Sequence, residues 1–127
     1  MIFASVDYAR YRSGRGRYTE PSMVEHGWLR ATATNVSRLE QAAVPGQIFF
    51  LHRRRSLVAF GIMFVDNQTL ANHCGVMLAG GNVVEALTRG GVVQRPFSVY
   101  ADDTSYLCVA ATQLSADQSA RVAAAAA

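Results

Sequence analysis

Arginine is the residue type in this sequence that points most clearly to a chemistry. All twelve lysine-plus-arginine residues are arginine, and a guanidinium is a planar fork of donors that suits phosphate. Seven of them lie in two stretches, residues 10–18 and 53–55. The first stretch adds glycine and tyrosine, which give a flexible backbone and stacking rings to a nucleic-acid contact. We therefore predict phosphate contacts from Arg10, Arg12, Arg15, Arg17, Arg53, Arg54 and Arg55.

Aromatic residues could add base stacking to this surface. The predicted stacking or pocket residues are Trp28, Tyr11, Tyr18 and Phe60. Each also has a structural interpretation, because aromatic side chains on strands usually form the core. The arginines likewise have an alternative interpretation as a solvated surface that keeps a small domain soluble.

Histidine, cysteine and paired carboxylates form no motif that indicates a catalytic or metal site. Metal sites usually show paired ligands at short spacing, whereas His73 and Cys74 are adjacent and would point to opposite faces of a strand. The pair Asp102 and Asp103 suits a turn better than a cation site. We therefore predict no catalytic residue, no metal and no cofactor.

Composition indicates one globular domain over residues 1–127. Half of the residues are apolar and 17% are charged, unlike a disordered chain. The longest apolar run, residues 57–65, has nine residues, whereas a membrane helix needs about twenty. The N-terminus lacks a basic leader, and two cysteines are too few for a disulfide framework. These features predict a cytoplasmic protein with no membrane partner.

Charge is distributed unevenly along the chain. Residues 1–55 hold nine of the twelve arginines and four of the nine acidic residues. Any electropositive surface should therefore come from the first half.

Local patterns predict the elements that position these residues. We predict strands at 2–9, 26–34, 47–53, 56–65, 92–100 and 105–113, and short helices that start near Ser37 and Asn82. Residues 10–21 read as a mobile loop, and 53–55 as the tip of a hairpin. A second hairpin should turn at 101–104, with Pro96 marking an edge strand or bulge. Residues 115–127 form either a C-terminal helix or a non-native tail, since they end in five alanines.

The predicted fold class is α+β. About six mostly antiparallel strands would form a barrel or a strongly bent sheet, with two or three short helices.

The order of features over residues 26–65 resembles the PUA-like β-barrel group, especially its EVE and ASCH branches. The matching segments are HGWL, VSRLEQA, VPGQIFFLH, RRR and SLVAFGIMFV. The sequence departs from the group at Gln47, where an acid commonly follows the glycine. The resemblance implies a barrel whose pocket accepts a nucleobase, often a modified one, and only Trp28 and residues 53–55 carry over.

The leading prediction is a non-enzymatic binding domain for nucleic acid or a nucleotide-like ligand. One alternative is a small-molecule module whose apolar pocket, lined by Phe60, Met63 and Phe64, lies at a homodimer interface. Another is a small hydrolase-like enzyme that pairs His52 or Cys74 with an acid such as Asp102.

Overall fold

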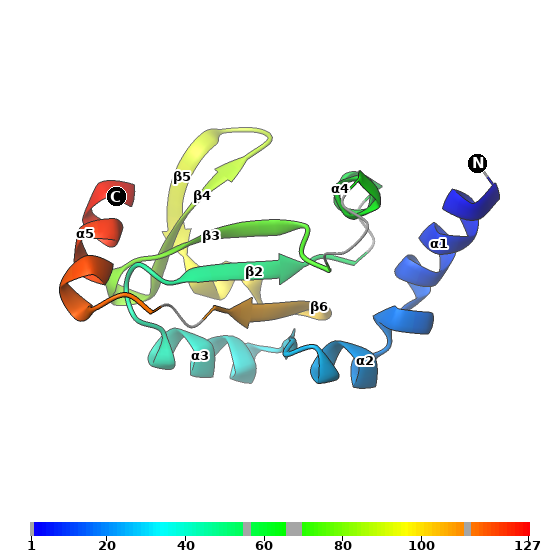
Figure 1. The fold of residues 1–127 in the computed structure, drawn as a ribbon, viewed down its shortest axis with the longest axis horizontal. Helices are drawn as coiled ribbons and strands as arrows, with labels where there is room; N and C mark the ends of the chain where they lie inside the picture. The colour runs from blue at the N-terminus through cyan, green and yellow to red at the C-terminus, as the bar shows by residue number, and fades with distance from the viewer. Residues whose placement is uncertain (1, 55–56, 66–69, 111–112) are drawn as a thin grey trace.

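A single six-stranded antiparallel sheet organises the molecule (Figure 1). The computed structural model describes residues 2–54, 57–65, 70–110 and 113–127. The strands run in the order β1-β6-β2-β3-β4-β5, so β1 and β5 are the edges and the sheet is open rather than a barrel. Their bounds are β1 Leu29–Ala31, β2 Ile48–His52, β3 His73–Met77, β4 Asn82–Leu87, β5 Gly91–Pro96 and β6 Asp102–Val109. The predicted α+β class and strand number are confirmed.

Five α-helices and three 3-10 turns connect the strands in the described part of the chain. The helices are α1 Ile2–Ser13, α2 Glu20–Glu25, α3 Ala33–Ala42, α4 Leu57–Val65 and α5 Ala116–Ala126, and the turns are η1 Gly16–Tyr18, η2 Ala79–Gly81 and η3 Phe97–Tyr100. Figure 1 places α1 and α4 at one end of the sheet and α5 at the other. No helix among the described residues is long and apolar enough to cross a bilayer.

The main core lies between one face of the sheet and the helical elements α3 and η3. Alternate strand residues point inward because side chains change face at every position, and they meet Val36 of α3 and Phe97 and Tyr100 of η3. The buried members of this cluster are Ala31, Val36, Phe49, Leu51, Met77, Val83, Phe97, Tyr100 and Leu107.

The predicted hairpin of residues 47–53 and 56–65 is wrong. The first strand is present as β2, but residues 57–65 form helix α4, and β2 pairs with β3 and β6 instead. A run that is apolar throughout has no alternation, so it cannot distinguish a strand from a buried helix. Helical spacing lets Phe60 and Met63 pack against α1 and η1 while Val58 and Ile62 stay exposed.

The N-terminal prediction is also wrong. Residues 2–13 are helical rather than a strand, and η1 and α2 occupy much of the predicted loop at 10–21. Gly14 and Gly16 have φ of 65° and 62°, which turns the chain between α1 and η1. Buried Tyr11 and Tyr18 then attach this segment to the rest of the protein.

Two further predictions need correction. The residues after Asn82 form β4 rather than a helix, because the apparent cap residue Glu85 points into the protein and binds charged and polar partners. Strand β5 pairs with β4, whereas β6 pairs with β1 and β2, so the hairpin predicted across 101–104 does not form. Pro96 does lie on an edge strand. The helix predicted to start near Ser37 is present as α3, but it starts four residues earlier, with Thr32 as its N-cap. The strand predicted at 26–34 is present only as the short β1.

Helix α5 docks where glycine is required. Ser115 and Gln118 form a reciprocal capping box at its start. Its Ser119 backbone lies against Gly46, which has φ of 92°. A Cβ at residue 46 would collide with the Ser119 carbonyl oxygen.

We expect Gly46→Ala to destabilise the protein by roughly 2–4 kcal/mol, because it adds this collision to the cost of a positive φ. Gly27→Ala is the matched control: Gly27 has φ of 87°, but a Cβ there would meet no atom within 4 Å, so only the φ cost of about 1 kcal/mol applies. Urea unfolding of both variants gives the difference. Equal losses would show that α5 does not pack on residue 46.

Candidate functional site

A pocket of about 400 Å³ opens between α4 and the β4–β5 hairpin. Its apolar wall comes mainly from one side of α4, and its polar groups come from the end of β2, the start of β3 and the turn after β4. The lining residues are Arg53, Val58, Ala59, Ile62, Asn72, His73, Ala86, Leu87, Thr88 and Arg89. Two guanidinium groups and an imidazole thus face an apolar surface.

The backbone of Arg53 is held firmly although its side chain is exposed. Its N–H donates to Asn72 Oδ1 at 2.8 Å, and its carbonyl accepts from Asn72 Nδ2 at 3.0 Å. The hydroxyl of Tyr11 also donates to the Arg53 carbonyl. Buried Asn72 therefore fixes where the guanidinium emerges, which reduces the entropy lost when it binds an anion.

Arg53 also borders a second, smaller pocket of about 170 Å³ that contains Asp102. Burial opposes ionisation of this carboxyl, but hydrogen bonds from Thr104 and Ser105, together with the charge of Arg53, lower the pKa of Asp102 overall. Asp102 is thus occupied by local hydrogen bonds, but at the first residue of β6 rather than in the predicted hairpin turn.

Glu85 of β4 forms the centre of a buried polar cluster beside the first pocket. Its side chain is fully buried and accepts hydrogen bonds from His73 Nε2, Arg95 Nε and the Tyr100 hydroxyl. Arg95 Nη2 also donates to the Tyr100 oxygen at 3.3 Å. The cluster ties β3, β4, β5 and η3 together and fixes His73 at the pocket wall.

Gly75 makes room for this arrangement. A Cβ there would lie 2.7 Å from the Val84 carbonyl oxygen and 2.5 Å from the Phe49 ring. The Phe49 ring in turn contacts His73, with centroids 6.3 Å apart. The position of His73 therefore depends on a small residue two positions along its own strand.

On the opposite face of the sheet, His52 lies inside a cage of aromatic rings. The rings of Tyr11, Tyr18, Trp28 and Tyr106 have centroids 5.6–6.1 Å from its own. His52 Nδ1 donates to the Leu70 carbonyl at 2.7 Å, whereas Nε2 is buried and has no hydrogen-bond partner. The cage therefore accommodates a neutral imidazole.

Burial lowers the pKa of His52 from its ordinary 6.5 to about 4. The hydrogen bond to Leu70 opposes this shift, and the positive charges of Arg54 and Arg17 add to it. His52 is therefore a structural residue in this fold. His52 contacts the aromatic cage, whereas Asp102 binds Thr104 and Ser105. Cys74 is exposed. The structure therefore does not bring His52 or Cys74 together with Asp102 as the hydrolase alternative requires.

The structure describes six of the seven predicted phosphate contacts, and these six fall into three groups. Arg10, Arg12, Arg15 and Arg17 are exposed around α1 and η1, and Arg17 also donates to the Tyr18 hydroxyl at 2.9 Å. Arg53 enters the pocket. Arg54 has a structural role, and Arg55 lies outside the described residues.

Arg54 attaches the N-terminal segment to the sheet. Its guanidinium lies over the Tyr106 ring, 5.4 Å from the centroid, and donates to the Tyr18 carbonyl at 3.2 Å. It also packs against Gly14, where a Cβ would lie 2.7 Å from Nη1. The segment predicted to be mobile is thus held by an arginine predicted to bind phosphate.

The four predicted stacking aromatics are buried. Tyr11, Tyr18 and Phe60 pack in one cluster with Met63, and Trp28 packs with Met23 and Tyr106. Their rings contact protein in this structure, and their stacking on a ligand stays a prediction.

Sequence reasoning missed the pocket residues Asn72 and Arg89, rejected His73 as a metal or catalytic candidate, and interpreted Glu85 behind the pocket as a helix-cap residue. The available signal was in residues 82–87, where β-branched residues favour a strand. A strand would place Glu85 on the same face as Val83, which would have indicated a buried acid that needs partners.

Comparisons with known proteins give no relative: no family model, curated protein or solved structure matches this chain. The described residues also contain no group of three or more histidine, cysteine or acidic side chains placed to hold a metal ion. The site is therefore interpreted from its geometry alone.

We expect protonation of His52 to make folding pH-dependent. The unfolded chain binds this proton below pH 6.5, whereas the folded chain binds it only near pH 4. The contribution of neutral His52 to the free energy of unfolding is complete above pH 6.5. About 3 kcal/mol of this contribution is lost as the pH falls to about 4. Urea unfolding at several pH values measures it.

His52→Phe should flatten that part of the pH dependence, and His26→Gln, at an exposed histidine, should leave it unchanged. An identical pH dependence in His52→Phe and wild type would show that His52 protonates as readily in the folded state as in the unfolded chain.

We expect Arg54→Gln to loosen the N-terminal segment, because the contacts with Gly14, Tyr18 and Tyr106 are lost. Trypsin cleaves after arginine, so limited proteolysis reports opening at Arg15 and Arg17. A loss of about 1–2 kcal/mol in local stability predicts roughly 5–30-fold faster cleavage there. Arg53→Gln, which keeps the backbone bonds of residue 53, is the control, and equal cleavage rates in the two variants would refute the anchoring role.

Proposed function

We propose that this chain binds a nucleotide-like ligand in the pocket between α4 and the β4–β5 hairpin. The observation that carries the proposal is the pairing of Arg53 and Arg89 with an apolar wall in one pocket. The volume of about 400 Å³ lies within the range of small-molecule sites. Phosphate would bind the guanidinium groups, and the base would lie on the apolar wall.

The apolar wall supports this assignment. Val58 and Ile62 are 67% and 49% exposed although they belong to a strongly apolar helix. Exposed apolar surface beside charged groups is typical of ligand-binding sites. A flat ring packed on α4 would cover both side chains.

The arginines of the N-terminal segment extend the same proposal to nucleic acid. Arg10 and Arg12 belong to α1, Arg17 belongs to η1, and Arg15 lies between these elements. Both elements lie at the end of the sheet where α4 also lies (Figure 1). Exposed guanidinium groups along α1 and η1 could hold the backbone of a single strand whose nucleotide occupies the pocket.

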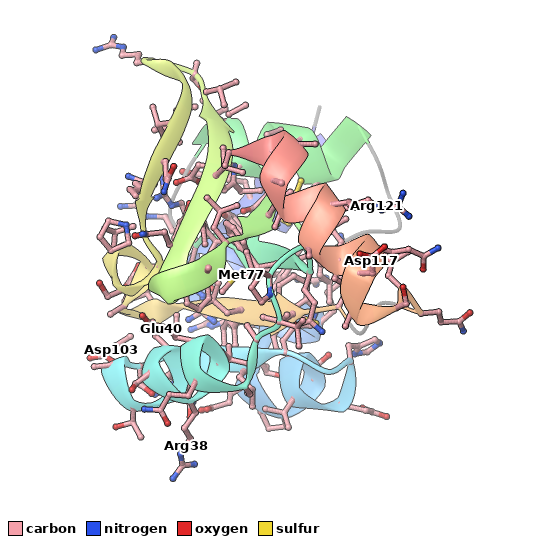
Figure 2. All side chains as sticks on the ribbon, turned by 90° about the vertical axis from the view of Figure 1, so that its left-hand side faces the viewer. Arg38, Glu40, Met77, Asp103, Asp117 and Arg121 are labelled. Carbon is pink, nitrogen blue, oxygen red and sulfur yellow. The ribbon has the colours of Figure 1, made fainter. Side chains whose placement is uncertain are left out.

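The opposite end of the molecule differs in charge. Figure 2 shows Arg38, Glu40, Asp117 and Arg121 at that end, so both signs are present. Arg121 also pairs with Asp117, with 3.5 Å between Nε and Oδ2. This end is a natural location for charge-matched control substitutions.

We expect Arg53→Gln/Arg89→Gln to weaken binding of short single-stranded RNA or DNA at least tenfold. Two lost phosphate contacts should reduce the salt slope of log K by about 1.4. Fluorescence anisotropy at about 50 and 200 mM salt measures both, with adenosine 5′-monophosphate as competitor. Arg38→Gln/Arg121→Gln removes the same charge from the other end and should have a much smaller effect.

Equal weakening by the two double variants would show a diffuse charge effect and no pocket. Absence of binding by the wild type to both oligonucleotide and nucleotide would reject the proposal.

The exposed α4 surface favours a second candidate function, a small-molecule module that binds an apolar ligand at the same wall. A second copy of this chain could cover that wall, which would place the pocket at a homodimer interface. The sequence predicts other residues for this wall than the structure shows. Phe60 and Met63 face the interior, and the side chain of Phe64 is outside the part of the chain that the structure describes. Val58 and Ile62 form the wall instead. Val58→Asp would abolish dimerisation measured by sedimentation velocity, whereas a monomeric wild type would remove the dimer from consideration.

A further inference from the structure

We propose that Glu85 fixes His73 as a hydrogen-bond acceptor toward the pocket, so that the pocket prefers a nucleotide with ribose hydroxyls to one whose sugar lacks them. This inference rests on the proposed function and adds a specificity-determining residue to it. The preference depends on where the protons of the buried cluster lie.

The carboxylate of Glu85 determines which nitrogen of His73 carries a proton. An ionised carboxylate only accepts hydrogen bonds, and the fully buried Glu85 side chain contacts His73 Nε2. At a pH where the imidazole is neutral, it therefore holds its proton on Nε2. Nδ1 is then the acceptor nitrogen of the ring.

The other partners of Glu85 reinforce this arrangement. Arg95 donates from Nε to the carboxylate and from Nη2 to the Tyr100 oxygen, so the Tyr100 proton points to Glu85. Arg95 also balances the carboxylate charge in the buried cluster. Glu85 thus stays an acceptor, and His73 is oriented by groups that do not line the pocket.

His73 stands near the proposed phosphate position. It follows Asn72, whose side chain holds the backbone of Arg53 on both sides, and both residues line the pocket with His73. In a nucleotide, the hydroxyl groups closest to the phosphate are those of the sugar. An acceptor beside the phosphate site therefore meets a ribose hydroxyl before it meets a group on the base.

Besides the imidazole of His73, the pocket lining includes the rotatable hydroxyl of Thr88, which can donate or accept, and Asn72 Oδ1, which accepts from the Arg53 N–H. Arg53 and Arg89 have donors only, so they bind phosphate but do not recognise a hydroxyl proton. The His73 side chain is 23% exposed, so water competes for Nδ1 when the hydroxyl is missing. A net hydrogen bond of this kind corresponds to a preference of about tenfold.

Substitution of Glu85 by glutamine separates this role from a purely structural one. A glutamine amide can donate to Nε2, which would move the histidine proton to Nδ1 and turn the acceptor into a donor. Tyr100→Phe removes one hydrogen bond from the same cluster but leaves the carboxylate opposite Nε2. The two variants therefore perturb the cluster similarly and differ in the histidine tautomer.

The test measures affinity for the four ribonucleoside 5′-monophosphates and their 2′,3′-dideoxy analogues by isothermal titration calorimetry. We use pH 8, above the ordinary pKa of an imidazole. We expect the wild type and Tyr100→Phe to bind at least one ribonucleotide about tenfold more tightly than its dideoxy analogue. Glu85→Gln should reduce this ratio to about one.

His73→Phe provides a second variant if Glu85→Gln does not fold. It should lower affinity for the ribonucleotide and leave affinity for the dideoxy analogue nearly unchanged. Equal affinities in the wild type, or a ratio that persists in Glu85→Gln or His73→Phe, would overturn this inference and leave the proposed function standing. Failure of the wild type to bind any of the eight nucleotides would reject both.

Discussion

The interaction on which the pocket depends is the hydrogen bonding of the buried Glu85 carboxylate. A carboxylate removed from water is costly unless charge and donors compensate it. Its three donors come from β3, β5 and η3, so satisfying one side chain fixes three elements around β4. Arg95 and Tyr100 compensate the negative charge of Glu85, and moving either of them away would expose that cost. These bonds therefore hold the β4–β5 hairpin in a defined position beside α4.

A second constraint lies on the other face of the sheet. The segment from α1 to α2 has little core of its own, and it is attached by rings around His52 and by the guanidinium of Arg54. The hydroxyl of Tyr11 reaches the Arg53 carbonyl, so this attachment also contacts the backbone that positions a pocket arginine. The two faces of the sheet are thus linked through adjacent residues of one strand end, His52 and Arg53.

Some local patterns predict the structure correctly, whereas those at residues 2–9 and after Asn82 do not. The strand at 48–52 and the edge position of Pro96 follow from residue preferences within a few positions. Residues 57–65 cannot be assigned in this way, because a uniformly apolar run fits either a helix or a central strand. The pairing of β5 with β4 rather than β6 depends on contacts that local propensity does not encode.

The site shows the same division. Arg53 is predicted from the sequence as a phosphate contact, and it lines the pocket. Arg54 has the same chemistry, but its contacts with Gly14 and Tyr106 reveal a structural role. Sequence patterns do not single out His73, because the adjacent Cys74 would point to the opposite face of a strand. Its partner Glu85 lies twelve residues away and reaches it across the sheet. Glu85 has the spacing of a helix-cap residue in the sequence but is a buried carboxylate of β4 in the structure. Interpreting it as a buried acid would have pointed to the cluster behind the pocket.

The most direct test of the central claim, that a nucleotide occupies the pocket beside α4, is a ¹H–¹⁵N NMR titration of the whole chain with adenosine 5′-monophosphate. We expect saturable shifts concentrated at the backbone amides of Arg53, Ala59, Asn72, His73 and Arg89, with amides of α5 unchanged. Shifts centred on α5 or α3, or no shifts at millimolar nucleotide, would contradict the claim.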